Sequence, residues 1–138
     1  MRRDLGPGDL GGLLEAPLVA VLATYRKDGG VLLSPVWHRW RDGGFDVVSR
    51  SDDVKVGHLR RDPRANIVVY EHVPPYRGIE LRTEARVLTE GAAEAVEPIA
   101  SRYLGADEGR RYASSAPDDI LIRLEAGVIR AWDFADGW

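Results

Sequence analysis

Two Asp-Gly pairs, at residues 28–29 and 42–43, interrupt short runs of apolar or alternating residues in the first half of the chain. Such pairs accept the positive φ that a tight turn requires, so each one predicts a β-hairpin. Short apolar runs between turns favour strands over helices. The first half therefore predicts a three-stranded meander, with strands at 17–25, around Ser34–Trp37 and at 45–49.

The rest of the pattern extends this β prediction. Residues 17–25 are nearly all apolar, which predicts burial on both faces. Pro35 removes a hydrogen-bond donor, so its strand should lie at a sheet edge or contain a bulge. Further strands are expected at 65–71, 79–87, 119–125 and 128–134, and helices at 8–15, 52–61 (capped by Ser51) and 90–103. Together these predict a mainly β fold, a barrel of six to seven antiparallel strands with peripheral helices.

Length and composition exclude several classes of protein. With 138 residues the chain fits one domain, residues 1–138. A net charge of −3 argues against nucleic-acid binding, since a phosphate backbone favours a broad basic face. The lack of cysteine excludes disulfides, a thiolate nucleophile and Cys-ligated metals. The sequence shows neither a signal peptide nor a long apolar span, so we expect no membrane segment and a cytoplasmic location.

One strand end gathers hydroxyl groups and cations. Ser49, Arg50 and Ser51 end the strand expected at 45–49, and Lys55 lies in the first turn of the next helix. Phosphate and carboxylate oxygens favour this mixture of donors, so the segment is a candidate site for an anionic ligand. The alternative is a solvated surface of mixed charge, formed by Arg60, Arg61, Arg64, Asp52, Asp53 and Asp62.

Several segments follow one another in a distinctive order: Val19–Thr24, the turn at 28–29, Leu33–Trp37, the turn at 42–43, Lys55 and His58–Arg64. Their order and spacing resemble the flavin/deazaflavin oxidoreductase superfamily. More narrowly, the chain resembles its small F420-dependent, pyridoxamine-phosphate-oxidase-like members. The likeness covers roughly residues 10 to 134 and implies an FMN-binding split β-barrel.

This resemblance also implies a site. Such proteins are homodimers that bind F420, or alternatively FMN, in two grooves along the subunit interface. The residues expected along the tricyclic ring are Ser34, Pro35, Val36 and Trp37. Those expected at the phosphate and its linker are Ser49, Arg50, Ser51 and Lys55, assisted by Arg60. Tyr76 and Arg77 match a loop that reaches the cofactor of the other subunit, and Trp132 matches a ring that we assign first to the core.

Four positions depart from the pattern of these relatives. Asp53 stands where many have a second basic residue, which weakens the expected phosphate binding. His58 replaces the usual Asn, Thr83 replaces a common Gly, and Leu32 occupies a position that is polar in some F420 binders. Each change either retunes the choice of cofactor or alters only the packing.

The function implied by the resemblance is hydride transfer from F420 to an unsaturated small molecule. The alternatives are an FMN-binding oxidase or reductase and a non-catalytic carrier of a cofactor, lipid or tetrapyrrole. Asp53 favours F420, because the phosphomonoester of FMN would gain from the missing second cation. No catalytic residue is assigned, and His38 is better explained as a strand histidine than as a proton donor. The three histidines show no metal-ligand spacing, so no metal site is expected.

Overall fold

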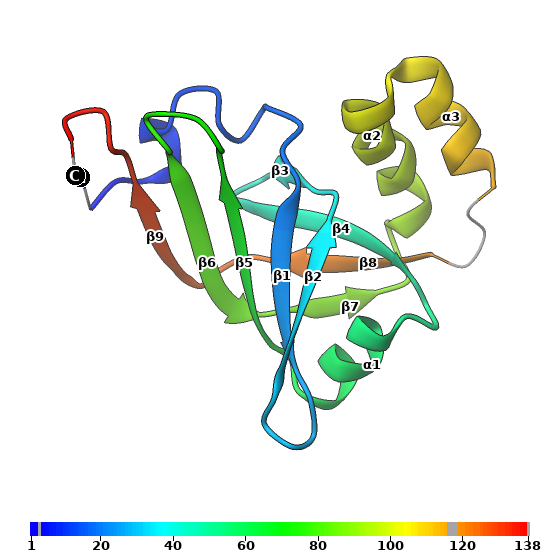
Figure 1. Ribbon diagram of the computed structural model, residues 1–138. Helices are drawn as coiled ribbons and strands as arrows, with labels where there is room; N and C mark the ends of the chain where they lie inside the picture. Colours follow the sequence, from blue (N-terminus) through cyan, green and yellow to red (C-terminus); the bar gives the residue numbers. More distant parts are fainter. Residues whose placement is uncertain (3, 116–118, 138) are drawn as a thin grey trace.

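A computed structural model describes residues 1–2, 4–115 and 119–137, and nine strands within them form two antiparallel sheets (Figure 1). One sheet has the strand order β2-β1-β5-β6-β9, and the other has the order β3-β4-β8-β7. The strands are β1 (Ala20–Tyr25), β2 (Val31–Val36), β3 (Arg39–Arg41), β4 (Gly44–Arg50), β5 (Arg64–Tyr70), β6 (Gly78–Glu84), β7 (Arg86–Leu88), β8 (Asp119–Leu124) and β9 (Val128–Trp132). The mainly β, antiparallel fold with peripheral helices is confirmed, with nine described strands rather than six or seven.

The chain changes sheets at Trp37 and His38. β1 pairs with β2 and β3 pairs with β4, so both predicted hairpins are present. β2 ends at Val36, however, and β3 begins at Arg39 in the other sheet. The three-stranded meander is therefore wrong, because the middle strand is divided by a corner between two hairpins. β2 is an edge strand, as Pro35 predicts.

Burial follows the alternation along the strands. In β1 every second residue is buried and the others are partly exposed, so the predicted burial on both faces is wrong. The strand predicted at 79–87 is divided into β6 and β7, which belong to different sheets. Ala85 lies at this break and donates its N–H to the Pro63 carbonyl at 2.7 Å. The alternation continues across the break, since Ile79, Leu81 and Ala85 are all buried.

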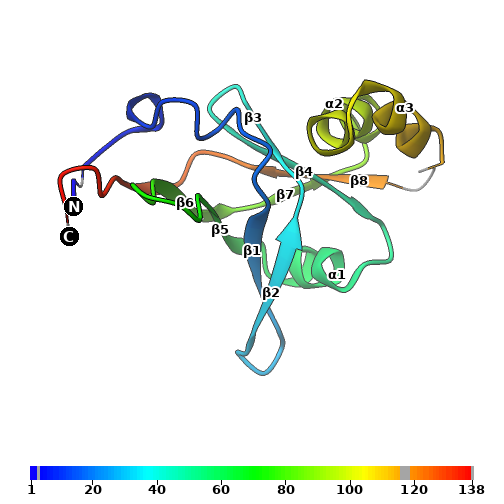
Figure 2. The same cartoon turned by 45° about the horizontal axis from the view of Figure 1, so that its top comes forward.

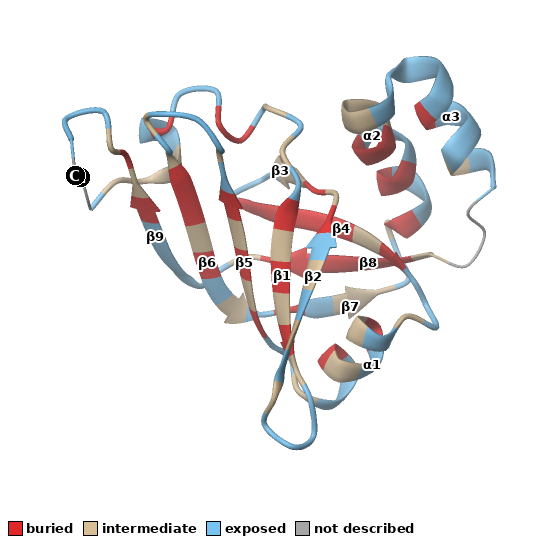
Figure 3. Cartoon of the chain, in the orientation of Figure 1, coloured by how far each residue is buried: buried red, intermediate tan, exposed pale blue. Residues whose placement is uncertain are grey.

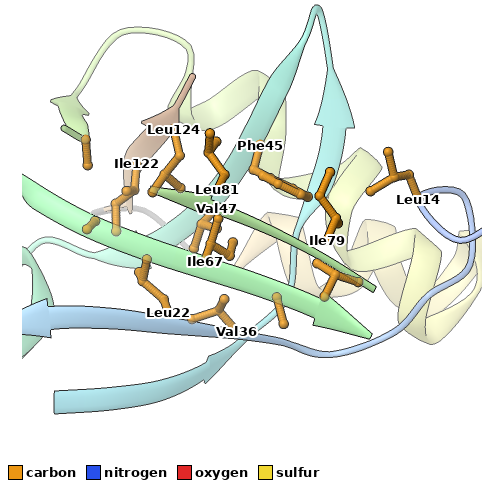
Figure 4. Packing of buried hydrophobic residues seen from close by; sticks show 14 of the residues in the cluster. Leu14, Leu22, Val36, Phe45, Val47, Ile67, Ile79, Leu81, Ile122 and Leu124 are labelled. Atoms are coloured by element: carbon orange, nitrogen blue, oxygen red, sulfur yellow. The ribbon is translucent and has the colours of Figure 1, made fainter. Parts of the chain in front are cut away.

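The main core lies between the two sheets, where the buried segments of both face each other (Figure 3). Figure 4 shows side chains of the two sheets meeting there. The five-stranded sheet contributes Leu22, Ile67, Ile79 and Leu81, and the four-stranded sheet contributes Phe45, Val47, Ile122 and Leu124. Burial of this apolar surface is the main term that stabilises the arrangement of the sheets.

Three α-helices flank the sheets: α1 (Val54–Arg61), α2 (Ala92–Leu104) and α3 (Ala106–Ser114). Figure 2 shows α2 and α3 side by side next to β4 and β8, with α1 on the other side of these strands. Helices α1 and α2 confirm two predictions, although Asp53 rather than Ser51 is the N-cap residue of α1. None of the helices in the described part of the chain is long and apolar enough to cross a membrane.

One helix prediction was wrong, and one helix was not predicted. The segment 8–15 is not an α-helix; it contains only a 3₁₀ turn at Pro7–Asp9, and Gly11 follows with a φ of 58°. Its leucines at 10, 13 and 14 are nevertheless buried, as their spacing suggested. Helix α3 was not predicted, because Gly109 is its only buried residue and its apolar pattern is correspondingly weak.

The C-terminal end of α2 joins three parts of the chain. The Tyr103 hydroxyl donates to the Leu18 carbonyl at 2.8 Å and accepts the main-chain N–H of His38 at 3.1 Å. The His38 imidazole donates from Nε2 to the same carbonyl at 3.0 Å. Arg102 donates to the Ala16 carbonyl at 3.0 Å. These bonds fix the corner between the sheets, the segment before β1 and α2 relative to one another.

Replacing Tyr103 with Phe should therefore destabilise the fold. The change leaves the ring stacking intact but removes the acceptor of the buried His38 N–H, which should cost about 1–3 kcal/mol. Equilibrium denaturation with urea measures this loss. Tyr112→Phe is the matched control, since that side chain is 47% exposed, and it should change the free energy of unfolding by less than about 0.5 kcal/mol. Equal effects of the two substitutions would contradict the role given to the Tyr103 hydroxyl.

Candidate functional site

The residues predicted along the ring lie at one sheet edge. Ser34–Val36 end β2, which has a neighbouring strand on only one side within the described sheet. Trp37 follows and is partly buried. Its indole stacks on the Tyr103 ring, with centroids 5.0 Å apart and planes 8° from parallel, and lies 5.5 Å from the Tyr112 ring. The edge thus presents main-chain groups, and α2 and α3 fix the orientation of the adjoining indole.

Trp37 also faces the end of β4. A small cavity of about 50 Å³ is lined by Trp37 together with Ser49 and Arg50. The remaining wall comes from Val48 and Asp119 of the sheet and from the helices through Val96, Ile99, Ala100 and Tyr112. The structure therefore brings the predicted ring side and the predicted phosphate side together within one subunit.

Lys55 and Ser49 share one partner, Asp53. The Lys55 ammonium lies 2.7 Å from Asp53 Oδ2, and the Ser49 hydroxyl donates to the same oxygen at 3.1 Å. The Lys55 side chain is only 13% exposed, and Ser49 is 7% exposed. The hydrogen bond from Lys55 is the main cause that holds the Asp53 pKa below its usual value. Asp53 is thus an ionised carboxylate bound to the groups that were predicted to hold the phosphate.

The second predicted cation is paired as well. Arg50 is largely exposed, and its Nε lies 3.3 Å from Asp52 Oδ1. Ser51 is exposed in the turn between β4 and α1, and Arg60 is exposed on α1, farther along the chain. The segment from Arg50 to Lys55 therefore carries two cations and two carboxylates, so its formal charge is zero.

Tyr76 and Arg77 lie at the other end of β5 from α1, in the loop that leads to β6 (Figure 1). Arg77 makes a bidentate pair with Glu71, through Nε at 2.9 Å and Nη2 at 3.0 Å, and donates from Nη1 to the Leu10 carbonyl at 2.7 Å. The hydrogen bonds of Arg77 lower the Glu71 pKa. The two predicted loop residues are thus not brought to Trp37 and Ser49 of the same subunit, and the guanidinium of Arg77 anchors the loop.

His38 is a core residue. Its side chain is fully buried, and burial is the main cause that lowers its pKa to about 4, with the Arg102 charge adding to it. A neutral, buried imidazole is not a suitable general acid near pH 7, so a structural role is favoured. His38 lies in the corner between β2 and β3, however, and not within a strand as expected. Within the described residues no group of three His, Asp or Glu side chains is arranged to hold a metal ion.

The other unusual residues make contacts within the subunit. His58 Nδ1 lies 3.0 Å from the hydroxyl of the buried Thr24, which ties α1 to β1. Thr83 donates its hydroxyl to the Glu125 carbonyl. Trp132 is partly buried over Gly78, where any added side chain would meet its ring, and the Arg130 guanidinium lies 4.5 Å from the ring centroid. These contacts explain His58, Thr83 and Trp132 through packing.

Sequence reasoning missed three residues of this region. Tyr103 is the last residue of the helix expected at 90–103 and was given no role in the site, and Tyr112 lies on the helix that was not predicted. Asp53 was read as a missing cation, whereas the structure makes it the partner of Lys55. The signal for this pairing was present in the sequence as an acid two residues before the only lysine of the segment.

Two comparisons by sequence have different outcomes. The family model described as Pyridoxamine 5′-phosphate oxidase matches residues 10–133. A search of the curated proteins found no match.

Solved structures share the fold along almost the whole chain. A conserved hypothetical protein from Mycobacterium tuberculosis is 23% identical with a TM-score of 0.77, over 94% of this chain and 85% of that one. A structure described as an F420 reductase is 21% identical with a TM-score of 0.67, over 90% and 98% of the two chains. An FAD-binding protein from Mesorhizobium loti is 18% identical with a TM-score of 0.67, over 94% and 93%.

Because the pKa of His38 is lowered, the protein should lose stability at a pH above the interval in which its carboxyl groups titrate. The unfolded chain takes up this proton near pH 6.5, whereas the folded protein resists it until about pH 4. The contribution of neutral His38 to the free energy of unfolding should therefore be fully present above pH 6.5 and decrease as the pH falls toward 4. The expected loss is about 2 kcal/mol between pH 7 and pH 5. Denaturant unfolding at these two pH values measures the difference.

His38→Gln is the test of this assignment, because glutamine keeps an N–H donor and has no proton to gain. The variant should lose much less stability than the native protein between pH 7 and pH 5. The paired carboxyl groups of Asp46, Asp53 and Glu71 have lowered pKa values and titrate mainly below this interval. The same pH dependence in both proteins would show that another group is responsible.

Proposed function

Because the chain belongs to the pyridoxamine 5′-phosphate oxidase family and has its split β-barrel fold, we propose that it is an F420-dependent oxidoreductase. Its reaction would be the transfer of a hydride from the reduced deazaflavin to an unsaturated small molecule. The similarity to the F420 reductase structure supports this proposal at the level of the fold. The observation that carries it is the charge balance at the predicted phosphate end of the site.

Both cations at that end already face aspartates. Lys55 is paired with Asp53, and Arg50 is paired with Asp52. A phosphomonoester such as that of FMN carries between one and two negative charges near pH 7, whereas a phosphodiester such as that of F420 carries one. A segment with no net positive charge is better suited to the singly charged group, which favours F420 over FMN.

The residues near Trp37 fit the remainder of such a cofactor. F420 supplies a ring carbon that carries the hydride, and the protein must orient the ring and its acceptor and exclude water. Here the free edge of β2 offers main-chain donors and acceptors to the polar side of a ring, and the indole of Trp37 offers an apolar surface. Ser49 lines the same cavity as Trp37, and Lys55 is joined to Ser49 through Asp53, so the linker and phosphate would be bound on this side.

FMN is the second candidate, for one specific reason. Lys55 and the Ser49 hydroxyl both contact a single carboxylate oxygen of Asp53, and that side chain is 39% exposed. A rotation of Asp53 toward solvent would leave an ammonium and a hydroxyl free for a phosphomonoester. The similarity to an FAD-binding protein also supports a flavin-type cofactor, on the basis of the fold alone.

We further propose that the active form is a homodimer. The outer face of β1 and β2 is apolar, and Leu33 is 64% exposed on it. The residues that share this face, as cross-strand pairs, are Val21 with Pro35, Ala23 with Leu33 and Tyr25 with Val31. A second copy is the fitting occupant, because relatives place the loop that matches Tyr76 at the cofactor of the other subunit, and in this chain that loop follows the end of β5 that is far from α1.

The cofactor preference is tested by titrating the purified protein with F420 and with FMN while following tryptophan fluorescence. We expect F420 to bind with a micromolar or lower Kd and FMN to bind at least about tenfold more weakly. Quenching by F420 should be smaller in Trp37→Phe than in Trp40→Phe, because only Trp37 lines the candidate site. A preference for FMN would contradict the proposal and support an FMN-binding oxidase or reductase instead.

Activity requires a separate measurement. Reduced F420 should be oxidised when the protein is mixed with a panel of conjugated acceptors, and the absorbance of the cofactor follows this reaction. The control is the same mixture without protein, in which the absorbance should stay constant. Saturable binding of F420 without turnover of any acceptor would instead support a cofactor carrier.

The dimer is tested by Leu33→Glu. A charged side chain on the apolar face should convert the dimer into a folded monomer, because an unpaired carboxylate is costly to bury in an interface. Light scattering coupled to gel filtration measures the mass. Leu104→Glu is the matched control, since Leu104 is 41% exposed at the end of α2, away from this face, and the variant should remain dimeric. A native protein that is monomeric and still binds cofactor would exclude the shared groove.

A further inference from the structure

Asp53 occupies the position that a ligand anion would take. Its Oδ2 atom accepts hydrogen bonds from the Lys55 ammonium at 2.7 Å and from the Ser49 hydroxyl at 3.1 Å. An ammonium and a hydroxyl that converge on one oxygen form the pattern that binds a phosphate oxygen. The carboxylate is therefore an internal substitute for the phosphate of a ligand.

The three groups differ in how far they can move. Ser49 is 7% exposed and belongs to β4, where it pairs with Ile120 of β8, so its position is fixed by the sheet. Lys55 is 13% exposed on α1. Asp53 is 39% exposed and lies on the solvent side of the pair. An incoming anion would therefore meet Asp53 first and reach Lys55 only by displacing it or by lying beside it.

Asp53 is the N-cap residue of α1, a position at which aspartate is preferred. The hydrogen bond from Lys55 is the largest of the interactions that lower the Asp53 pKa, and the main-chain N–H of Val54 at the start of the helix is the last of them. The carboxylate therefore interacts mainly with Lys55 and Ser49 and less with the helix N-terminus.

We propose that Asp53 determines which cofactor tail is accepted by acting as an intramolecular competitor for Lys55 and Ser49. Its charge opposes a doubly charged phosphomonoester more strongly than a singly charged phosphodiester or an uncharged tail. This inference rests on the proposed function, because it names the residue of the same site that discriminates between F420 and FMN. It predicts that one neutral substitution, Asp53→Asn, broadens the cofactor range to include FMN.

The test compares FMN with riboflavin, which has the same ring and ribityl chain but no phosphate. In the native protein the two Kd values should differ by less than about threefold, because Asp53 cancels the contribution of the phosphate. In Asp53→Asn the affinity for FMN should rise by at least about tenfold, while that for riboflavin stays unchanged. Asp53→Ser, which also removes the charge and places a preferred N-cap residue at this position, is the second variant if the first lowers the melting temperature.

Asp62→Asn is the matched control. It removes the same charge at the other end of α1, from a side chain that pairs with Arg64, a residue outside the candidate site. The ratio of FMN to riboflavin affinity should stay within about threefold of the native value. An increase as large as that of Asp53→Asn would overturn the proposal, because it would show a general charge effect.

Inorganic phosphate separates this inference from the proposed function. Amide resonances of residues 49–55 in ¹⁵N-labelled protein should respond to phosphate at a concentration at least about tenfold lower in Asp53→Asn than in the native protein. If no variant binds F420 or FMN but phosphate shows this difference, the proposed function and the choice between cofactor tails fail, while the competition of Asp53 with an anion for Lys55 and Ser49 stands. If F420 binds but Asp53→Asn and the native protein respond equally to phosphate and to FMN, the role of Asp53 is overturned and the proposed function stands.

Discussion

The Leu18 carbonyl is the acceptor on which the corner between the two sheets depends. It receives the imidazole of His38 at 3.0 Å and the hydroxyl of Tyr103 at 2.8 Å, so it joins the segment before β1, the corner between the sheets and α2. A buried donor or acceptor is costly to leave unpaired, so these hydrogen bonds favour one conformation of the corner. Trp37 precedes His38 directly, so the same bonds direct its indole toward Tyr103 and the end of β4.

Local patterns in the sequence predicted the strands better than their partners. Both Asp-Gly turns, the edge position of Pro35 and the alternation around Ile79 to Val87 are present in the structure, because each depends on residues that are close in the chain. The division of strands between two sheets at Trp37–His38 and at Ala85 depends on contacts with Leu18 and Pro63, which lie about 20 residues away along the chain. Helix α3 has too weak an apolar face to be seen in the sequence.

The sequence predicted part of the residue set that the structure brings together at the candidate site, but not its electrostatic environment. The sequence placed Ser49, Arg50 and Lys55 at one strand end. In the structure, Trp37 lines the same cavity as Ser49 and Arg50. Spacing alone does not reveal which way an exposed carboxylate turns, so the pairing of Asp53 with Lys55 required the folded structure. A cluster that looks cationic in the sequence is therefore neutral in the fold, and this neutrality is what bears on the choice of cofactor.

The edge strand β2 has a consequence for the behaviour of the protein at high concentration. An edge strand with exposed apolar residues, such as Leu33 beside the free main chain of β2, is a template onto which further strands can add. A proline on such a strand has no N–H to offer, and its ring obstructs a new neighbour. Pro35 therefore discourages the growth of the sheet into fibrous aggregates while leaving the apolar face of β1 and β2 open to packing.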